Sequence, residues 1–304
     1  KLSDLGRYPL KTSDLIIMHL NMDKAPSEIT WMPDKNSQVV IHGYANSPEL
    51  YRPFSIGSEL YDYESKYMYV DTAGGGQNGD ETVAWVVYFL HGFIFGMEML
   101  ALDGGLSESN FLAMSDLAFR HQVQEIGVEQ NHGFGAFAQA WRPVLLDYYE
   151  EKTGKRHAPK IDDDWVSTQK ELRIIDTLEP VMARHKLIIN ESVLQYDIDT
   201  AKKKPIDLQQ VYTIVNQINR ITRDRNALVH DDRIDSLAAA VKRFVDKMAV
   251  TEVMRIQQKM KSENMQMMAE WSEEFATGLK PKLGGATRFT GSKSNRMKRR
   301  LKRR

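Results

Sequence analysis

The fold is decided by a stretch that reads KYMYVD (66–71), TAGGGQNGDE (72–81), TVAWVVYFL (82–90) and FIFGMEMLAL (93–102). Three of these runs are apolar and rich in aromatic and branched residues, which favours strands. The glycine-rich run contains Asn78-Gly79, a hairpin signal, and His91-Gly92 marks a second turn. We therefore expect three consecutive strands, the first of which ends on Asp71.

The segment 84–102 approaches the length of a membrane span. A span needs about 20 residues almost free of charge, whereas this segment contains His91, Gly92, Gly96 and Glu98. Two buried strands that turn at His91-Gly92 explain the segment better. We expect a soluble protein with no membrane partner.

Helix and strand patterns alternate after these strands. Ser107 is a helix N-cap candidate, Pro180 is expected to end a helical run, and a polar loop is expected at 162–164. The expected elements are a helix at 107–121, a strand at 124–131, a helix at about 134–152, a helical run at 167–178, a strand at 186–190, and helices at 208–221 and 230–248. Together they predict an α/β fold, with a mixed five-stranded sheet flanked by helices and the Asp71 strand at its centre.

Composition predicts four regions. Residues 1–64 are dense in Pro, Asp, Ser and Tyr and lack a helical period, so we expect a linker or N-terminal extension. Residues 65–250 form the expected core domain. Residues 251–279 are expected to form a Met-rich amphipathic helix that packs on the core or binds a partner. Residues 280–304 are rich in Gly, Ser, Lys and Arg, and we expect a disordered tail.

The net charge of zero over 304 residues conceals an asymmetry. Eleven of the 41 Lys and Arg residues lie in 280–304, which has no Asp or Glu, so residues 1–279 carry 30 basic against 41 acidic residues, a net of −11. An acidic body with a basic tail indicates nucleic acid or an acidic docking partner.

Two absences exclude classes of function. The chain has no Cys, which excludes disulfide scaffolds, thiolate metal sites and cysteine nucleophiles. It also has no GxxxxGK[ST] element, so we expect no ATP hydrolysis.

Acidic residues stand at three places where chemistry gathers in α/β folds. Asp71 and Glu129 lie at the ends of expected strands, and Asp231-Asp232 opens an expected helix. Carboxylates that converge there repel one another unless cations lie between them. Mg²⁺ or Mn²⁺ would suit such oxygen ligands, and two such ions could activate a water and stabilise the leaving oxygen of a phosphodiester.

Each acid also has an ordinary interpretation. Asp232 with Asp235 resembles a helix-capping arrangement. Asp71 precedes a glycine-rich turn and suits a turn position, and Glu129 could end its strand in solvent. It is the combination of the three places that favours a metal site.

Four segments carry a family resemblance. They are VDTAGGGQNGDET (70–82), IGVEQNHGFGAF (126–137), KELRIIDTLEPVMARHKLII (170–189) and LVHDDRIDSLAAAVKRF (228–244). In this order they resemble the C-terminal nuclease domain of the bacteriophage large terminase subunit, called DNA maturase B in short-tailed phages. The resemblance implies a ribonuclease H-like fold and a nuclease that cuts concatemeric DNA to genome lengths with low sequence specificity.

The resemblance also implies roles for individual residues. Asp71, Glu129 and Asp232 match the catalytic acids, and the same three with Asp231 are the implied ligands of two Mg²⁺ or Mn²⁺ ions. Weaker candidates are Asp235 and His230 as supporting residues, and Lys170, Arg173, Arg299 and Arg300 as DNA contacts.

The implied partners are double-stranded DNA, the portal protein, the small terminase subunit and the ATPase domain of the same full-length chain. The implied location is the host cytoplasm rather than the mature virion. Two alternatives remain at this point. The chain could be a non-catalytic module that docks on DNA or the portal, or another ribonuclease H-like nuclease of the resolvase or transposase type.

Overall fold

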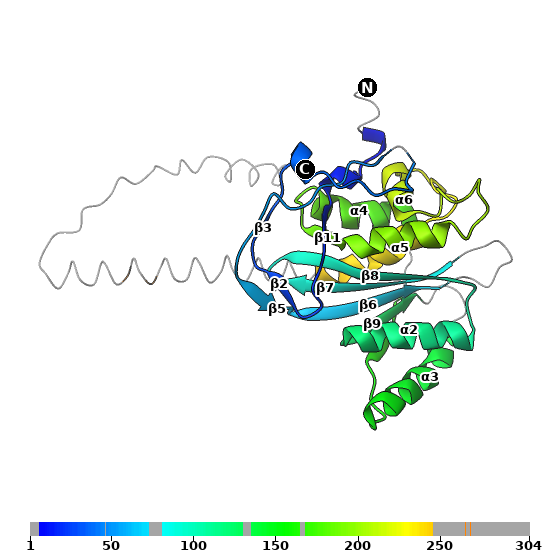
Figure 1. Cartoon of the computed structure of the whole chain (residues 1–304). Coiled ribbons are helices and arrows are strands. Elements are labelled where there is room, and N and C mark those ends of the chain that lie inside the picture. The colour runs from blue at the N-terminus through cyan, green and yellow to red at the C-terminus, as the bar shows by residue number, and fades with distance from the viewer. Residues whose placement is uncertain are drawn as a thin grey trace, which may run out of the picture. The chain divides into compact units, whose positions relative to one another are not determined.

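A seven-stranded mixed sheet forms the centre of the described part of the chain (Figure 1). The computed structural model describes residues 6–45, 47–72, 81–129, 135–164, 168–245, 265 and 268. The strands lie in the order β1-β11-β8-β7-β6-β9-β10. Their bounds are Ile16–Met18 (β1), Ser65–Asp71 (β6), Glu81–Leu90 (β7), Phe93–Asp103 (β8), Glu125–Glu129 (β9), Lys160–Asp164 (β10) and Leu187–Asn190 (β11).

The sheet combines a meander with parallel crossovers. β6, β7 and β8 are successive antiparallel neighbours, as the sequence predicted. β9 pairs in parallel with β6, and β10 with β9. On the other side β11 is parallel to β8, and β1 to β11. β6 therefore lies between β7 and β9, so the Asp71 strand is an interior strand as expected, although the middle strand of the seven is β7.

Helices cover both faces of the sheet. Figure 1 shows α2 and α3 below the sheet and α4, α5 and α6 above it. A further helix over 232–245 belongs to the same core as α4, α5 and α6. The bounds are Glu108–His121 (α2), Ala136–Thr153 (α3), Lys170–Met182 (α4), Glu191–Ala201 (α5) and Ile214–Arg220 (α6).

The residues of β6 alternate between two hydrophobic cores. Tyr67 and Tyr69 belong to the core shared with α4, α5, α6 and 232–245, while Met68 and Val70 belong to the core shared with α2 and α3. Side chains of a strand alternate between faces with a period of two. The next residue, Asp71, therefore faces the α4 side. Burial on both faces also explains the uninterrupted apolar pattern of β7.

The N-terminal region contributes to this domain. Leu10, Leu15, Ile16 and Ile17 are at most 2% exposed, and β1 extends the sheet beyond β11. Smaller elements surround it, namely 3-10 helices at Thr12–Asp14 and Lys35–Ser37, the pair β2 (Lys24–Pro26) and β5 (Leu60–Asp62), and the pair β3 (Ile29–Thr30) and β4 (Ser55–Ile56). The connection of residues 1–64 to an ATPase domain stays a prediction.

The predicted count of five strands was wrong, because two short strands at the sheet edges were missed. β1 lies in the expected linker, and β10 includes the residues 162–164 expected as a polar loop. β10 is polar, and its Lys160 forms an ion pair with Asp162. Such an edge strand lacks the apolar alternation that identifies a strand in a sequence.

α2 begins as predicted, since Ser107 accepts a hydrogen bond from the Asn110 amide. The helices α4, α5 and α6 differ from the expected ones. Pro180 lies inside α4 and does not end it, because a proline in the last turn removes only one hydrogen bond. The helix expected at 208–221 forms only as α6, which starts after Thr213 caps it, and α5 was not predicted.

The chain divides into two units, residues 1–249 and 250–304. The helix predicted at 251–279 and the tail at 280–304, including Arg299 and Arg300, lie outside the described residues except for Met265 and Met268. Within the described ranges, no helix combines the length and apolarity that crossing a membrane requires.

Candidate metal centre

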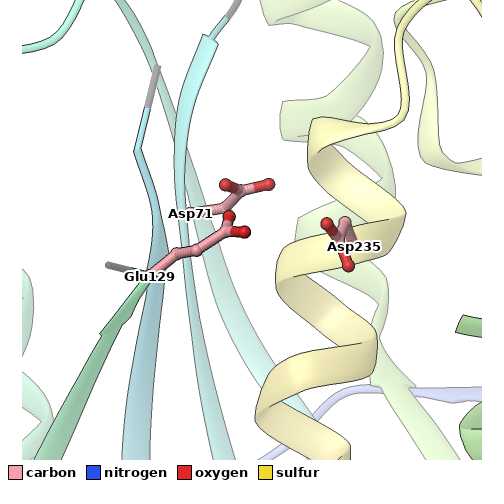
Figure 2. A group of neighbouring side chains, drawn as sticks. All are labelled: Asp71, Glu129 and Asp235. Atoms are coloured by element: carbon pink, nitrogen blue, oxygen red, sulfur yellow. The ribbon is translucent and has the colours of Figure 1, made fainter. Parts of the chain in front are cut away.

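Two carboxylates meet where β6 and β9 end. The strands are parallel and pair Val70 with Val128, so Asp71 and Glu129 occupy the next matched position. Figure 2 shows both side chains on the side of the sheet that faces the helix carrying Asp235. Asp71 is buried and Glu129 is half-buried. Parallel pairing thus brings together two acids that are 58 positions apart in the sequence.

The pairing of β6 with β9 depends on a glycine. A Cβ added at Gly127 would lie 2.1 Å from the Tyr67 hydroxyl and 2.8 Å from Cδ2 of Tyr69. The two tyrosine rings occupy the space where a side chain would stand. Gly127 lies two residues before Glu129, so the close approach fixes the strand next to the site.

Asp235 supplies a third carboxylate. Oxygen atoms of Asp71, Glu129 and Asp235 all lie within 4.8 Å of one another (Figure 2). Asp235 is only 2% exposed, although it lies one turn inside the helix 232–245. Three buried or half-buried acids, from two strands and one helix, therefore direct their carboxylates toward the same small region.

The start of that helix is fixed by Arg233, which is 0% exposed. Its Nε and Nη2 donate to the two carboxylate oxygens of Glu81 at 2.9 and 3.0 Å. Its Nη1 donates to Oδ1 of Asp197 at 2.7 Å. Trp85 Nε1 donates to the Arg233 carbonyl at 2.9 Å, and the Ser236 hydroxyl donates to the Val83 carbonyl at 2.9 Å. These contacts hold the helix against β7 and α5 and so place Asp235.

Two cations from α4 face the acids. Arg173 Nη2 donates to Oδ1 of Asp235 at 2.5 Å. Lys170 Nζ lies 3.1 Å from Oδ2 of Asp235 and 2.8 Å from Oδ1 of Asp231. Burial lowers the pKa of Lys170, but Asp235, Asp71 and Asp231 outweigh burial and raise it overall. Lys170 is therefore a permanent positive charge at the site.

The acids titrate abnormally. Burial raises the pKa of Asp71 well above its ordinary value of 3.8; Lys170 opposes this rise, and a hydrogen bond with Glu129 and the charge of Asp235 add to it. Burial likewise raises the pKa of Asp235, although Lys170 and Arg173 lower it. The raised pKa values mean that the buried acids disfavour joint ionisation without metal, and a bound cation would relieve this repulsion.

The donor set fits a hard divalent cation. Oδ2 of Asp71 is buried and has no hydrogen-bond partner among the described residues. A buried polar atom without a partner is costly and calls for an explanation, such as an ion. Three carboxylate groups within reach of one point are the oxygen ligands that Mg²⁺ and Mn²⁺ prefer.

The structure brings together only some of the predicted site residues. Asp71 and Glu129, expected to converge at strand ends, have carboxylate oxygens within 4.8 Å of each other, close enough to share ions about 4 Å apart. Asp235, ranked below Asp232 in the sequence, provides the third carboxylate. Oδ2 of Asp232 instead accepts a hydrogen bond from the Glu81 amide at 3.3 Å. Asp232 is the first residue of its helix, where it points toward the start of β7.

The remaining candidates lie around this group. Asp231 contacts Lys170, and the ring of His230 stacks on Tyr212 at 4.0 Å. Sequence reasoning gave Lys170 and Arg173 a weak role as DNA contacts, without their contacts to the acids, and missed Arg233. One available signal was the spacing of four between Asp231 and Asp235, which puts both on one helix face.

Fold and site together define an α/β nuclease-like domain of the ribonuclease H type, with acids at the carboxyl ends of its central strands. Residues 70–187 match the family described as Terminase Bacteriophage T7, Ribonuclease H-like domain. The chain is 31% identical over 243 residues to the large terminase subunit of Enterobacteria phage T3, covering 79% of this chain and 40% of that protein. The chain therefore belongs to the nuclease domains of phage large terminases, as the sequence resemblance indicated.

Solved structures give a weaker likeness. The large terminase nuclease from thermophilic phage G20c is 12% identical with a TM-score of 0.39, covering 77% of this chain and 97% of that one. The human cytomegalovirus terminase nuclease domain, Mn soaked and inhibitor bound, is 16% identical with a TM-score of 0.38, covering 59% and 83%. Membership of the family rests on the sequence matches.

Proposed function

We propose that this domain is a divalent-metal-dependent endonuclease that cuts viral DNA during genome packaging. The main support is the convergence of Asp71, Glu129 and Asp235 within 4.8 Å, in a chain that belongs to the terminase nuclease domains. Packing gains nothing from three acids at one buried point, whereas metal-assisted phosphodiester hydrolysis uses such a cluster to hold its ions.

Asp71, Glu129 and Asp235 would hold a Mg²⁺ or Mn²⁺ ion, and Asp231 is the next carboxylate toward a second ion. The metal supplies an activated water and stabilisation of the leaving oxygen. This assignment puts Asp235 in the place that the sequence gave to Asp232. Asp232 and His230 would then support the start of the helix.

The other side chains of the site orient these ligands. Arg173 is 9% exposed and fixes one oxygen of Asp235. The Lys170 side chain is 36% exposed, and its ammonium lies against Asp231 and Asp235. A half-exposed cation beside the acids suits contact with a DNA phosphate.

The substrate we propose is concatemeric double-stranded DNA, cut with low sequence preference. The proposed partners are the portal protein, the small terminase subunit and the ATPase domain of the full-length chain, in the host cytoplasm. A module that only docks on DNA or the portal would leave the buried acids unexplained, because burying carboxylates that bind no cation lowers stability.

The test is plasmid cleavage in Mn²⁺ or Mg²⁺, with and without a chelator. Asp71→Asn should reduce cleavage at least about 100-fold, because an amide brings less charge to a metal. Asp235→Asn should also be strongly impaired, and Asp232→Asn should keep more activity than either. Asp199→Asn is a matched control, since the partners of Asp199 among the described residues are Gln195 of its own helix and Lys202, which follows it.

A fully active Asp71→Asn protein, or cleavage that survives the chelator, would overturn the metal-dependent mechanism. If Asp232→Asn lost activity and Asp235→Asn kept it, the original ranking of the two acids would stand instead.

A further inference from the structure

Three exposed apolar side chains stand on separate loops outside the carboxylate centre. Leu106 lies between β8 and α2, Ile206 follows α5, and Val229 precedes the helix 232–245. They are 64%, 87% and 82% exposed, and the last two are the most exposed large apolar residues in the described part of the chain. Single apolar residues on a surface are ordinary, so the question is whether these three lie together.

A lysine ties the Ile206 loop to the Leu106 loop. Lys204 is 12% exposed, lies two residues before Ile206, and forms an ion pair with Asp103. Asp103 ends β8, three residues before Leu106. The same ammonium lies 3.0 Å from Oε1 of Glu81, at the start of β7. The two loops are therefore held together by largely buried charge.

Ring contacts bring the Val229 loop to the same place. Lys204 Nζ lies 4.6 Å from the centre of the Tyr212 ring. That ring stacks on His230, with the two centroids 4.0 Å apart. His230 lies between Val229 and Asp231, an acid of the candidate site. The three loops therefore meet beside the carboxylate centre.

The turn that carries Ile206 is firmly held. The side-chain amide of Gln209 donates to the carbonyls of Lys202 and Lys204, both at 3.2 Å. The backbone amide of Gln209 donates to the Pro205 carbonyl at 3.1 Å. An apolar side chain held in water contributes no burial to the fold, whereas a preorganised turn can place it in a partner at a small cost in entropy.

The position of the turn favours DNA as this partner. A duplex that reaches Asp231 also reaches the loops beside it. Lys203 is exposed on the same turn and suits a phosphate contact. Cations next to a protruding apolar residue are typical of proteins that insert a wedge between base pairs from the minor groove. Protein interfaces bury a continuous apolar core, whereas these side chains stand on three loops.

We propose that Ile206, flanked by Leu106 and Val229, is an apolar wedge that enters the minor groove of the DNA at the site. This inference rests on the proposed nuclease function. A wedge opens the step between two base pairs, and steps such as TA and CA open at the lowest cost. The wedge therefore biases cutting toward flexible steps without reading a base, which agrees with low sequence preference.

The experiment measures the binding of a short duplex with 2-aminopurine at a central TA step. All proteins carry Asp71→Asn, so that the duplex stays intact. Ile206→Ser should bind at least about fivefold more weakly than this parent, because an isoleucine is no longer buried in the complex. It should also lose the rise in fluorescence that unstacking produces. Ile206→Leu keeps an apolar side chain and should retain both properties.

Two controls separate the wedge from charge and from structure. Lys203→Gln should reduce the slope of log affinity against log salt by about 1, because a phosphate contact is lost, whereas Ile206→Ser should leave the slope unchanged. Ile56→Ser changes an isoleucine that is 50% exposed in the separate β3–β4 pair, and it should match the parent. Thermal melts identify any variant that fails to fold.

If Ile206→Ser binds and unstacks the duplex as the parent does, the wedge is overturned and the three side chains are left to a protein partner. Plasmid cleavage that depends on Asp71 would then leave the proposed nuclease standing. If the wild type cuts no plasmid in Mn²⁺ or Mg²⁺, the proposed function fails, and the binding comparison still decides whether Ile206 enters DNA.

Discussion

Two buried clusters of charge flank the first turn of the helix 232–245, and they differ in how completely their polar atoms are satisfied. All three nitrogens of the Arg233 guanidinium donate hydrogen bonds to Glu81 or Asp197. Asp197 also accepts from the Ile214 amide at 3.0 Å and the Tyr44 hydroxyl at 2.8 Å. In the carboxylate centre, Oδ2 of Asp71 and Nε of Arg173 have no hydrogen-bond partner within the described residues.

The difference separates a structural role from a chemical one. A satisfied network specifies how its elements pack, while unsatisfied groups with shifted pKa values are typical of functional sites. Burial alone does not distinguish them, because Arg233, Asp197, Asp71 and Asp235 are all at most 5% exposed.

The largest effect on stability should come from the satisfied cluster. Arg233→Met removes the cation and leaves Glu81 and Asp197 buried without it, although Lys204 Nζ stays 3.0 Å from Glu81. We expect a loss of about 3–5 kcal/mol in the free energy of unfolding. Chemical denaturation measures it, and a loss below about 1 kcal/mol would contradict the structural role.

The next effect should come from metal binding at the unsatisfied cluster. Mn²⁺ at one hundred times its dissociation constant should raise the free energy of unfolding by about 2.7 kcal/mol. Asp71→Asn should remove most of this gain, while Asp199→Asn should keep it. Thermal melts with and without Mn²⁺ give the comparison, and an equal gain in both variants would place the ion elsewhere.

A smaller effect concerns pH. The folded pKa of Asp71 lies above its unfolded value near 3.8, so the native state binds more protons and metal-free stability falls as pH rises from there through the raised pKa. Each unit of that rise costs about 1.4 kcal/mol. Asp71→Asn should flatten this slope. At pH values above about 3.8, where the wild-type protein loses stability, the variant should be the more stable of the two without metal. Urea unfolding at several pH values measures the slope, and an identical slope in both proteins would contradict the shift.

The smallest effect should come from an exposed ion pair. Arg223 pairs with Asp176 and Glu179 of α4 and is 49% exposed. Arg223→Ala should cost less than about 1 kcal/mol, because solvent screens such pairs. If Arg223→Ala lowered the free energy of unfolding as much as Arg233→Met does, solvent exposure would not explain the difference between the two ion-pair clusters.

The sequence identified the parts of the site that depend on local pattern. Asp71 and Glu129 were assigned correctly to strand ends, because an apolar run followed by an acid is visible in the residues themselves. The choice of Asp235 over Asp232 was not visible. It depends on how the helix 232–245 is rotated against the sheet, and Arg233 sets that rotation through Glu81, which is 152 positions away.

The same distinction explains the errors in the fold. β6, β7 and β8 follow one another closely in the sequence and were predicted, whereas β1 and β10 are short strands that pair with the edges of β11 and β9. Pairing of that kind is a property of the assembled sheet. The cations Lys170 and Arg173 were expected only as DNA contacts for the same reason, since only the folded α4 turns them toward the acids.

The first turn of the helix 232–245 joins the two clusters, since Arg233 and Asp235 lie two residues apart on it. A single rigid turn that serves both clusters makes their free energies interdependent, and such coupling is reciprocal. If the Arg233 network increases metal affinity by positioning Asp235, bound metal must stabilise the Arg233 network by the same free energy. Tyr44 and Asp197 reach the helix through Arg233. A perturbation of either residue should therefore weaken metal affinity, and metal should in turn slow hydrogen exchange around Tyr44.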